Sequence, residues 1–259
     1  MAPAQLRKSS RSRRGALPLA RAALCLLGVM ACQKVEPQRT TSSPPLSAPV
    51  TFVEAVGDNL AMPTRFECSV GQWRILVSAL GIATISKAGS KGNGSSLDLG
   101  ATPSDLSRLE AVRCAWVGTD ILLQFSGRYG EDGGGGELFR LDPVLPRVLW
   151  RLELGGNAGI PRVNGDRVYV SAHGMVGKAL LVSGTIVWQH RDLRDPYGGL
   201  IVVFDEPALD GPRVVYPVHQ AGILHPWPAA TRPEVVVDDA SGELLSPRFS
   251  GSEAAKYPQ

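Results

Sequence analysis

The sequence lacks an apolar run long enough for a membrane-spanning helix near its start. The run Ala22–Ala31 has ten residues, whereas a helix needs about 20 to cross a bilayer. Residues 1–31 also lack aspartate and glutamate, although they contain six Lys and Arg residues, all before the apolar run. These absences exclude a transmembrane helix at this position and leave the pattern of a secretory signal peptide.

Several catalytic signatures are also missing. The chain contains no Gly-x-Ser-x-Gly turn, no His-Glu-x-x-His segment and no Cys-x-x-Cys pair, which removes the usual motifs of serine hydrolases, zinc proteases and zinc sites. The glycine-rich segment Gly127–Gly136 lacks the lysine of a phosphate loop and the spaced acidic residues of a calcium loop. We interpret it as a flexible hairpin tip.

An excess of basic residues is absent once the signal is removed. The whole chain has 27 Lys and Arg against 24 Asp and Glu, a net charge of +3. Without the six basic residues of the signal, 21 remain against 24, so the mature chain has a net charge of −3. No nucleic-acid partner is therefore expected.

The end of the signal resembles the lipobox of bacterial lipoproteins. Val29-Met30-Ala31 precede Cys32 at the expected cleavage point, which predicts that Cys32 becomes the acylated N-terminus. The alternative is an ordinary signal peptide with an incidental cysteine. Gln33, rather than aspartate, follows the cysteine, and by analogy with that family this favours the outer membrane. We expect a lipid-anchored envelope protein that faces the periplasm or the cell surface.

The remaining chain divides by composition into three parts. Residues 32–50 are rich in Pro, Ser and Thr and have no apolar period, which predicts a solvated tether. Residues 51–250 form the expected folded domain, and residues 251–259 a C-terminal tail.

A repeat of 46 residues organises the predicted domain. Similar residues recur at this step in the segments WRILVS, TDILLQ, GDRVYV and GPRVVY. We predict four duplicated units with one buried core residue at an equivalent position in each. These core residues are Leu76, Leu122, Val168 and Val214.

Each unit contains four segments with the pattern of short strands. Alternating β-branched and aromatic residues between glycines predict antiparallel strands, and about 40–50 residues with four strands is typical of a propeller blade. The first strands are Cys68–Val70, Cys114–Val117, Pro161–Asn164 and Pro207–Asp210, and the second strands are the four segments above. The third are Ile82–Ser86, Glu137–Leu141, Lys178–Val182 and Glu234–Asp238; the fourth are Ser96–Leu99, Val148–Leu154, Thr185–Gln189 and Glu243–Leu245.

The stretch Asn164–Trp188 reads as strand, glycine turn, strand, Ser-Gly turn, and a strand that ends in tryptophan. This order resembles the blades of quinoprotein-like (pyrroloquinoline-quinone-type) β-propellers. Trp150 and Trp188 stand where these blades carry tryptophan, whereas Ser246 replaces it in the last unit. The resemblance implies an all-β, propeller-like domain of four antiparallel four-stranded blades.

The number of units leaves the closure of the propeller open, since propellers of this family often have eight blades. The four units could form a small closed ring, an open arc covered by a partner, or an arc that self-associates. The segment Thr51–Val56 has a strand pattern, and in a closed ring it could complete the last blade and join the two ends.

Two pairs of residues in the repeat are candidate sites. Cys68 and Cys114 begin the first strands of adjacent units, so in an exported protein they are either disulfide-bonded or two buried thiols. His173 and His219 both follow a second strand. They are either ligand contacts on one rim of the domain or a turn position that was duplicated with the rest of the unit.

These observations favour a non-enzymatic, lipid-anchored scaffold that binds other envelope proteins. Quinoprotein enzymes carry an adjacent Cys-Cys pair beside their cofactor, and this chain has no such pair, so we expect no cofactor, no metal and no catalytic residue. Non-catalytic propeller lipoproteins of the outer-membrane assembly machinery are a fold-level analogy. The alternative function is an envelope enzyme or ligand sensor that uses a rim site near His173 and His219.

Overall fold

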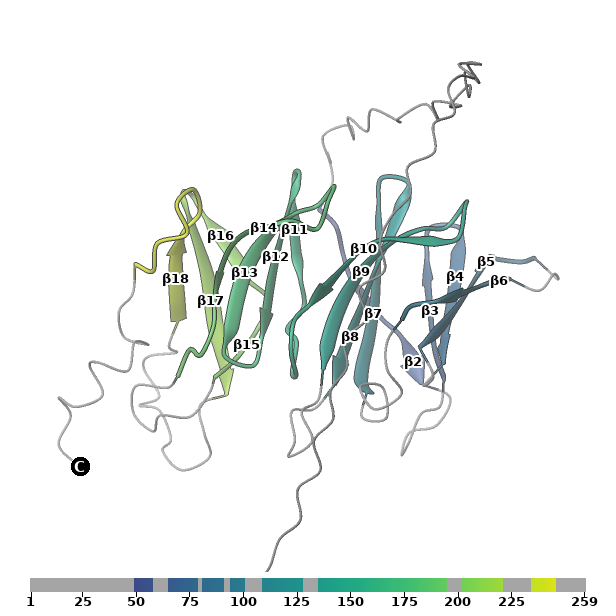
Figure 1. Cartoon of the computed structure of the whole chain (residues 1–259), viewed down its shortest axis with the longest axis horizontal. Helices are drawn as coiled ribbons and strands as arrows, with labels where there is room; N and C mark the ends of the chain where they lie inside the picture. Colours follow the sequence, from purple (N-terminus) through teal and green to yellow (C-terminus); the bar gives the residue numbers. More distant parts are fainter. Residues whose placement is uncertain are drawn as a thin grey trace, which may run out of the picture. The chain divides into compact units, whose positions relative to one another are not determined.

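The computed structural model describes residues 49–57, 65–78, 81–90, 94–100, 109–127, 135–194, 202–220 and 234–245. The chain divides into two compact units, Met1–Thr40 and Thr41–Gln259, and all described residues belong to the second. These residues form β-strands and no helix (Figure 1), which confirms the all-β prediction. Consequently, no membrane-spanning helix occurs among them. The signal, Cys32, Ser246, the tether up to residue 48, most of Gly127–Gly136 and the tail lie outside the described residues.

The strands assemble into four antiparallel sheets that follow the chain order (Figure 1). The first sheet contains β2 (Val56–Gly57), β3 (Arg65–Val70), β4 (Trp73–Ser78), β5 (Ile82–Lys87) and β6 (Ser95–Asp98). The second contains β1 (Val53–Glu54), β7 (Leu109–Val117), β8 (Asp120–Gly127), β9 (Gly136–Asp142) and β10 (Arg147–Glu153). The third contains β11 (Arg162–Asn164), β12 (Arg167–Ala172), β13 (Met175–Leu180) and β14 (Ile186–His190). The fourth contains β15 (Val203–Phe204), β16 (Ala208–Asp210), β17 (Arg213–Gln220) and β18 (Glu234–Asp238).

The predicted strands all have a counterpart except the last one. Glu243–Leu245 contributes a single bridge, from Leu244 to Val237, rather than a strand. In the fourth sheet, β15 and β16 both pair with β17 and together replace one continuous inner strand.

The turns between the first two strands of each unit give the structural register of the repeat. Each has a glycine with positive φ at the same place in the hairpin, where residues with a side chain are disfavoured. These glycines are Gly71, Gly118, Gly165 and Gly211. They lie 47, 47 and 46 residues apart, so the predicted constant step of 46 is wrong for the first two intervals.

This difference of one residue changes which face of a sheet a side chain occupies, because successive residues of a strand alternate between faces. Leu122 packs towards the third sheet, whereas Val168 packs back towards the second, and Val214 packs towards the third. Leu76 lies on the face of the first sheet opposite its core and is only half-buried. The prediction that all four residues are buried is therefore wrong for Leu76. The prediction that they occupy equivalent positions is also wrong.

Three core clusters lie between consecutive sheets. The first joins the first and second sheets, the second joins the second and third, and the third joins the third and fourth. The middle sheets are covered on both faces, and β8 and β9 are buried along their whole length. In the first sheet, β4 instead alternates between buried and more exposed residues, as a strand with one covered face does. Among the described residues, no core cluster joins the fourth sheet to the first.

The N-terminal segment corrects another expectation. Thr51–Val56 does not complete the last unit: within it, β1 pairs with β7 of the second sheet, and β2, which begins at Val56, pairs with β3 of the first. Phe52 packs against the core between the second and third sheets, and Ala55 against the core between the first and second. The segment therefore runs across the inner edges of the early sheets.

Candidate functional site

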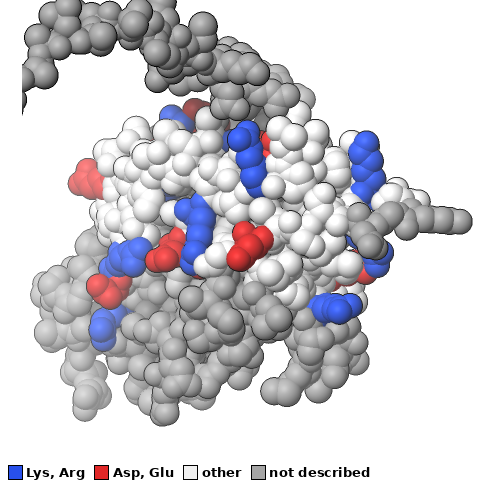
Figure 2. Space-filling view, turned by 45° about the vertical axis from the view of Figure 1, so that its right-hand side comes forward, with Lys and Arg blue, Asp and Glu red and all other residues white. Residues whose placement is uncertain are grey.

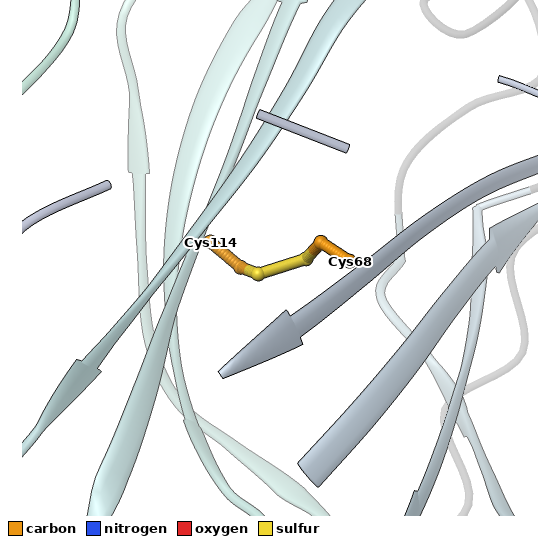
Figure 3. Close-up of a disulfide and its surroundings, with 2 residues drawn as sticks. All are labelled: Cys68 and Cys114. Carbon is orange, nitrogen blue, oxygen red and sulfur yellow. A yellow bond between two sulfur atoms is a disulfide. The ribbon is translucent and has the colours of Figure 1, made fainter. Parts of the chain in front are cut away.

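The two mature-domain cysteines form a disulfide between the first and second sheets (Figure 3). Cys68 lies on β3 and Cys114 on β7, with their Cα atoms 6.5 Å apart. Both side chains are buried in the first core cluster. The turn glycines of these sheets are 47 residues apart and the cysteines 46. Because the two spacings differ by one residue, Cys68 and Cys114 lie on the faces of the first and second sheets that are turned towards each other. At a spacing of 47 residues both side chains would point in the same direction along the array of sheets.

A cation and a tryptophan link the second sheet to the third. Arg140 and Trp150 are neighbours across β9 and β10. Both donate to the carbonyl oxygen of Leu181, from Nη1 of Arg140 at 2.7 Å and from Nε1 of Trp150 at 2.8 Å. Arg140 also donates from Nε to the Asp120 carboxylate at 2.7 Å. We call this two-donor arrangement the carbonyl clamp.

The carbonyl clamp recurs between the third and fourth sheets. Lys178 and Trp188 are neighbours across β13 and β14, and both donate to the carbonyl oxygen of Asp239, at 2.7 Å and 3.2 Å. Lys178 Nζ also lies 2.8 Å from the Asp239 carboxylate. The two tryptophans stand out in the sequence, whereas the two cations do not. The spacing could have revealed them, because Arg140 and Lys178 each lie ten residues before their tryptophan.

The outer turn of the next sheet receives each tryptophan. A Cβ added at Gly184 would lie 2.9 Å from the Trp150 ring, and one at Gly242 would lie 2.6 Å from Trp188. In the fourth sheet, Asp238 Oδ1 accepts hydrogen bonds from the backbone N and Oγ of Ser241, at 2.8 and 2.7 Å. These hydrogen bonds lower the pKa of Asp238. The Ser-Gly turns of the third and fourth sheets, Ser183-Gly184 and Ser241-Gly242, are therefore the surfaces on which the two tryptophans pack.

The two candidate histidines have different surroundings. His173 lies in the turn between β12 and β13, is half-buried, and donates its backbone N–H to the Gly156 carbonyl at 2.9 Å. His219 lies on β17 with a 62% exposed side chain, and its Nδ1 is 2.7 Å from Asp205 Oδ1. Within the described ranges, no group of three His, Cys, Asp or Glu side chains could hold a metal ion. The histidines share a place in the repeat, but they belong to separate sheets.

Exposed apolar side chains recur on the outer hairpins, and sequence reasoning did not find this feature. On the β9–β10 hairpin they are Val144, Leu145 and Leu149, and on the β13–β14 hairpin Val182, Ile186 and Val187. We call these six residues the outer-hairpin patch. Val144 is 70% exposed. The outer hairpins of two consecutive sheets therefore expose three large apolar side chains each.

Charged residues are mixed over the visible surface. Figure 2 shows described Lys and Arg side chains interspersed with Asp and Glu among uncharged residues, without a continuous basic area on that face. Some of these charges pair, as Arg74 does with Glu67 at 2.5 Å, and this contact lowers the pKa of Glu67. The mixed pattern does not have the form of a phosphate-binding stripe.

No protein-family model and no curated protein matches the chain. Among solved structures, the chain is similar to a quinohemoprotein alcohol dehydrogenase from Pseudomonas putida, with 13% identity and a TM-score of 0.46 over 76% of this chain and 35% of that one. It is also similar to BamB from Moraxella catarrhalis (18%, TM-score 0.38, 77% and 51%) and to a europium-containing methanol dehydrogenase (14%, TM-score 0.43, 75% and 43%). The chain thus spans about a third to a half of the length of these proteins. These proteins are similar to the chain with TM-scores below 0.5, and the likeness assigns no activity, cofactor or partner to it.

Proposed function

We propose that this chain is a lipid-anchored, non-enzymatic interaction protein of the bacterial cell envelope, with a propeller-like array of four sheets as its scaffold. The observation that carries the proposal is the outer-hairpin patch, because it places three exposed apolar side chains on the outer hairpin of each of two consecutive sheets. The carbonyl clamp between the second and third sheets supports it, since it holds the β9–β10 hairpin against the backbone of Leu181, next to the β13–β14 turn. The signal and Cys32 support the envelope address, and Gln33 after the cysteine supports the outer membrane.

The anchor is tested by changing Cys32→Ala and following the protein in membrane and soluble fractions. We expect the wild type in the membrane fraction with the added mass of acyl chains, and the variant in the soluble fraction. Cys25→Ala is the matched control, because Cys25 lies inside the signal and should not alter fractionation. A wild-type mature protein without added mass would contradict lipidation.

The interaction role is tested at the patch itself. The double change Val182→Asp and Val187→Asp should abolish cross-linking to other envelope proteins and leave the unfolding midpoint unchanged, since both side chains are 44% exposed. The matched control is Val56→Asp, which alters a 76% exposed residue outside the patch. Cross-linking that survives the double change would contradict a role for the patch.

The alternative function, an enzyme or ligand sensor with a rim site, is favoured by one contact. Asp205 lies against Nδ1 of the exposed His219 imidazole, and a carboxylate in this position orients an imidazole for proton transfer. In this alternative, His173 would be a second ligand contact on the same rim. A ligand that uses this site should shift the His219 ring NMR signals in the wild type but not in Asp205→Asn.

A further inference from the structure

The first and fourth sheets each have one face that none of the described core clusters covers. On the first sheet this face carries the half-buried residues Leu76, Ile82 and Thr84. On the fourth sheet it carries the half-buried residues Val215, Pro217 and Val236. We call these the leading face and the trailing face.

The internal interfaces show how such faces fit together. In each sheet, the residue four positions after the turn glycine is on the face towards the following sheet, and we call it the forward residue. The residues three and five positions after the glycine are on the face towards the preceding sheet, and we call them the backward residues. Leu122 is a forward residue of the second sheet, and it shares a core cluster with Val168 and Val170, the backward residues of the third. Val215 is the forward residue of the fourth sheet, and Leu76 is a backward residue of the first. The trailing and leading faces are therefore the two halves of one further interface of the same kind.

The chemistry of the two faces is complementary. In the trailing face, the cross-strand partner of Val215 is Val236. At the equivalent position, the second and third sheets carry the clamp cations Arg140 and Lys178 instead. The corresponding pair in the first sheet is Ile75 and Ile85, which is apolar and packs against the second sheet. The trailing face thus matches a known apolar interface of this molecule rather than a carbonyl clamp.

Charged residues of both signs surround the apolar residues on each face. The leading face carries two arginines and two carboxylates, namely Arg65, Arg74, Glu67 and Asp98. The trailing face carries one arginine and three carboxylates, namely Arg213, Asp210, Glu234 and Asp238, beside the His219–Asp205 pair. The excess of carboxylates on the trailing face disfavours contact between two trailing faces, whereas the leading face has no such excess.

We propose that a second copy of this chain covers both faces, with the trailing face of each copy packed on the leading face of the other. Two such contacts are related by a twofold axis and use both open faces of the described sheets, so the assembly ends at a dimer. The pair then contains eight sheets from the described residues of two copies, within the range of about 4–8 blades that closed propellers have. Pairing of this kind would also cover sheet faces that otherwise promote uncontrolled association.

The test is photo-cross-linking of the purified full mature chain with benzoylphenylalanine in place of Val236. We expect a product of twice the chain mass whose linked peptides come from residues 65–86. The matched control is the same probe at Val144, which is 70% exposed and outside both faces, and which should give no such product. If the probe at Val236 lowers the unfolding midpoint, the same probe at Pro217 on the same face decides the question.

The other outcomes each overturn the proposal. A product of single-chain mass with a link to residues 65–86 means that one chain closes on itself. An adduct with a different protein means a foreign occupant, and no adduct means that no second copy is present. Leu76→Lys should lower the yield of the double-mass product by about fivefold, and an unchanged yield would also contradict the proposed contact.

Discussion

At the scale of single residues, two tryptophans lie against glycines of the next sheet, and the contact leaves no room for a side chain at either glycine. Gly242 has φ of 76° and faces Trp188, whereas Gly211 has φ of 57° and nothing within 4 Å of an added Cβ. Both changes to alanine strain the backbone by about 1–2 kcal/mol. Gly242→Ala adds overpacking of about 1–3 kcal/mol.

We therefore predict that Gly242→Ala lowers the free energy of unfolding by about 2–5 kcal/mol and Gly211→Ala by about 1–2 kcal/mol. Urea denaturation of both variants measures the difference. Equal losses would show that Trp188 does not need the close approach to the turn.

The disulfide gives a second prediction at this scale. The loop closed by Cys68 and Cys114 spans 46 residues, so on the loop-entropy view the bond stabilises the folded chain by about 4 kcal/mol. Reduction of the folded protein should lower the unfolding midpoint accordingly. Alkylation of the denatured, unreduced protein should find neither cysteine reactive, and two reactive thiols would contradict the bond.

Sequence reasoning reached some of these residues and not others, for a physical reason. The tryptophans and the cysteines stand out because each is rare and recurs in the repeat. Arg140 and Lys178 do not stand out, because charged residues in a strand usually face solvent. Their burial becomes visible only when the carbonyl oxygens of the next sheet are placed beside them.

At the scale of strands, the sequence predicted nearly every element but not their common register. The predicted step of 46 came from matching residue types, whereas the register depends on the position of each turn glycine. In β8 and β9 both faces are buried, so apolar residues follow one another without alternation. A slip of one residue therefore leaves the sequence pattern almost unchanged while it reverses the faces.

The register predicts different costs for residues that the 46-residue step treats as equivalent. Leu122→Ala removes a fully buried side chain and should cost about 2–5 kcal/mol. Leu76→Ala changes a half-buried residue outside the first core cluster and should cost less than about 1.5 kcal/mol in the isolated chain. Equal losses in the free energy of unfolding would contradict this register and support a constant 46-residue step, with Leu76 and Leu122 in equivalent positions.

At the scale of the whole molecule, the N-terminal segment connects separate sheets. Its position was missed because a strand of two residues, which pairs with a strand elsewhere in the chain, carries no local signal of its partner. We predict that Phe52→Ala lowers the free energy of unfolding by about 1–3 kcal/mol, since Phe52 packs between the second and third sheets. The control Val56→Ala, at a 76% exposed residue, should change it by less than about 0.5 kcal/mol.

The segment also determines how the molecule would respond to mechanical force. A pull on residue 49 reaches β1 and β2 first, and these strands are paired with the second and first sheets. Because the disulfide joins those two sheets covalently, they resist the pull as one body. The carbonyl clamp between the third and fourth sheets lies beyond this load path, so tension applied at residue 49 leaves these two sheets in their relaxed geometry.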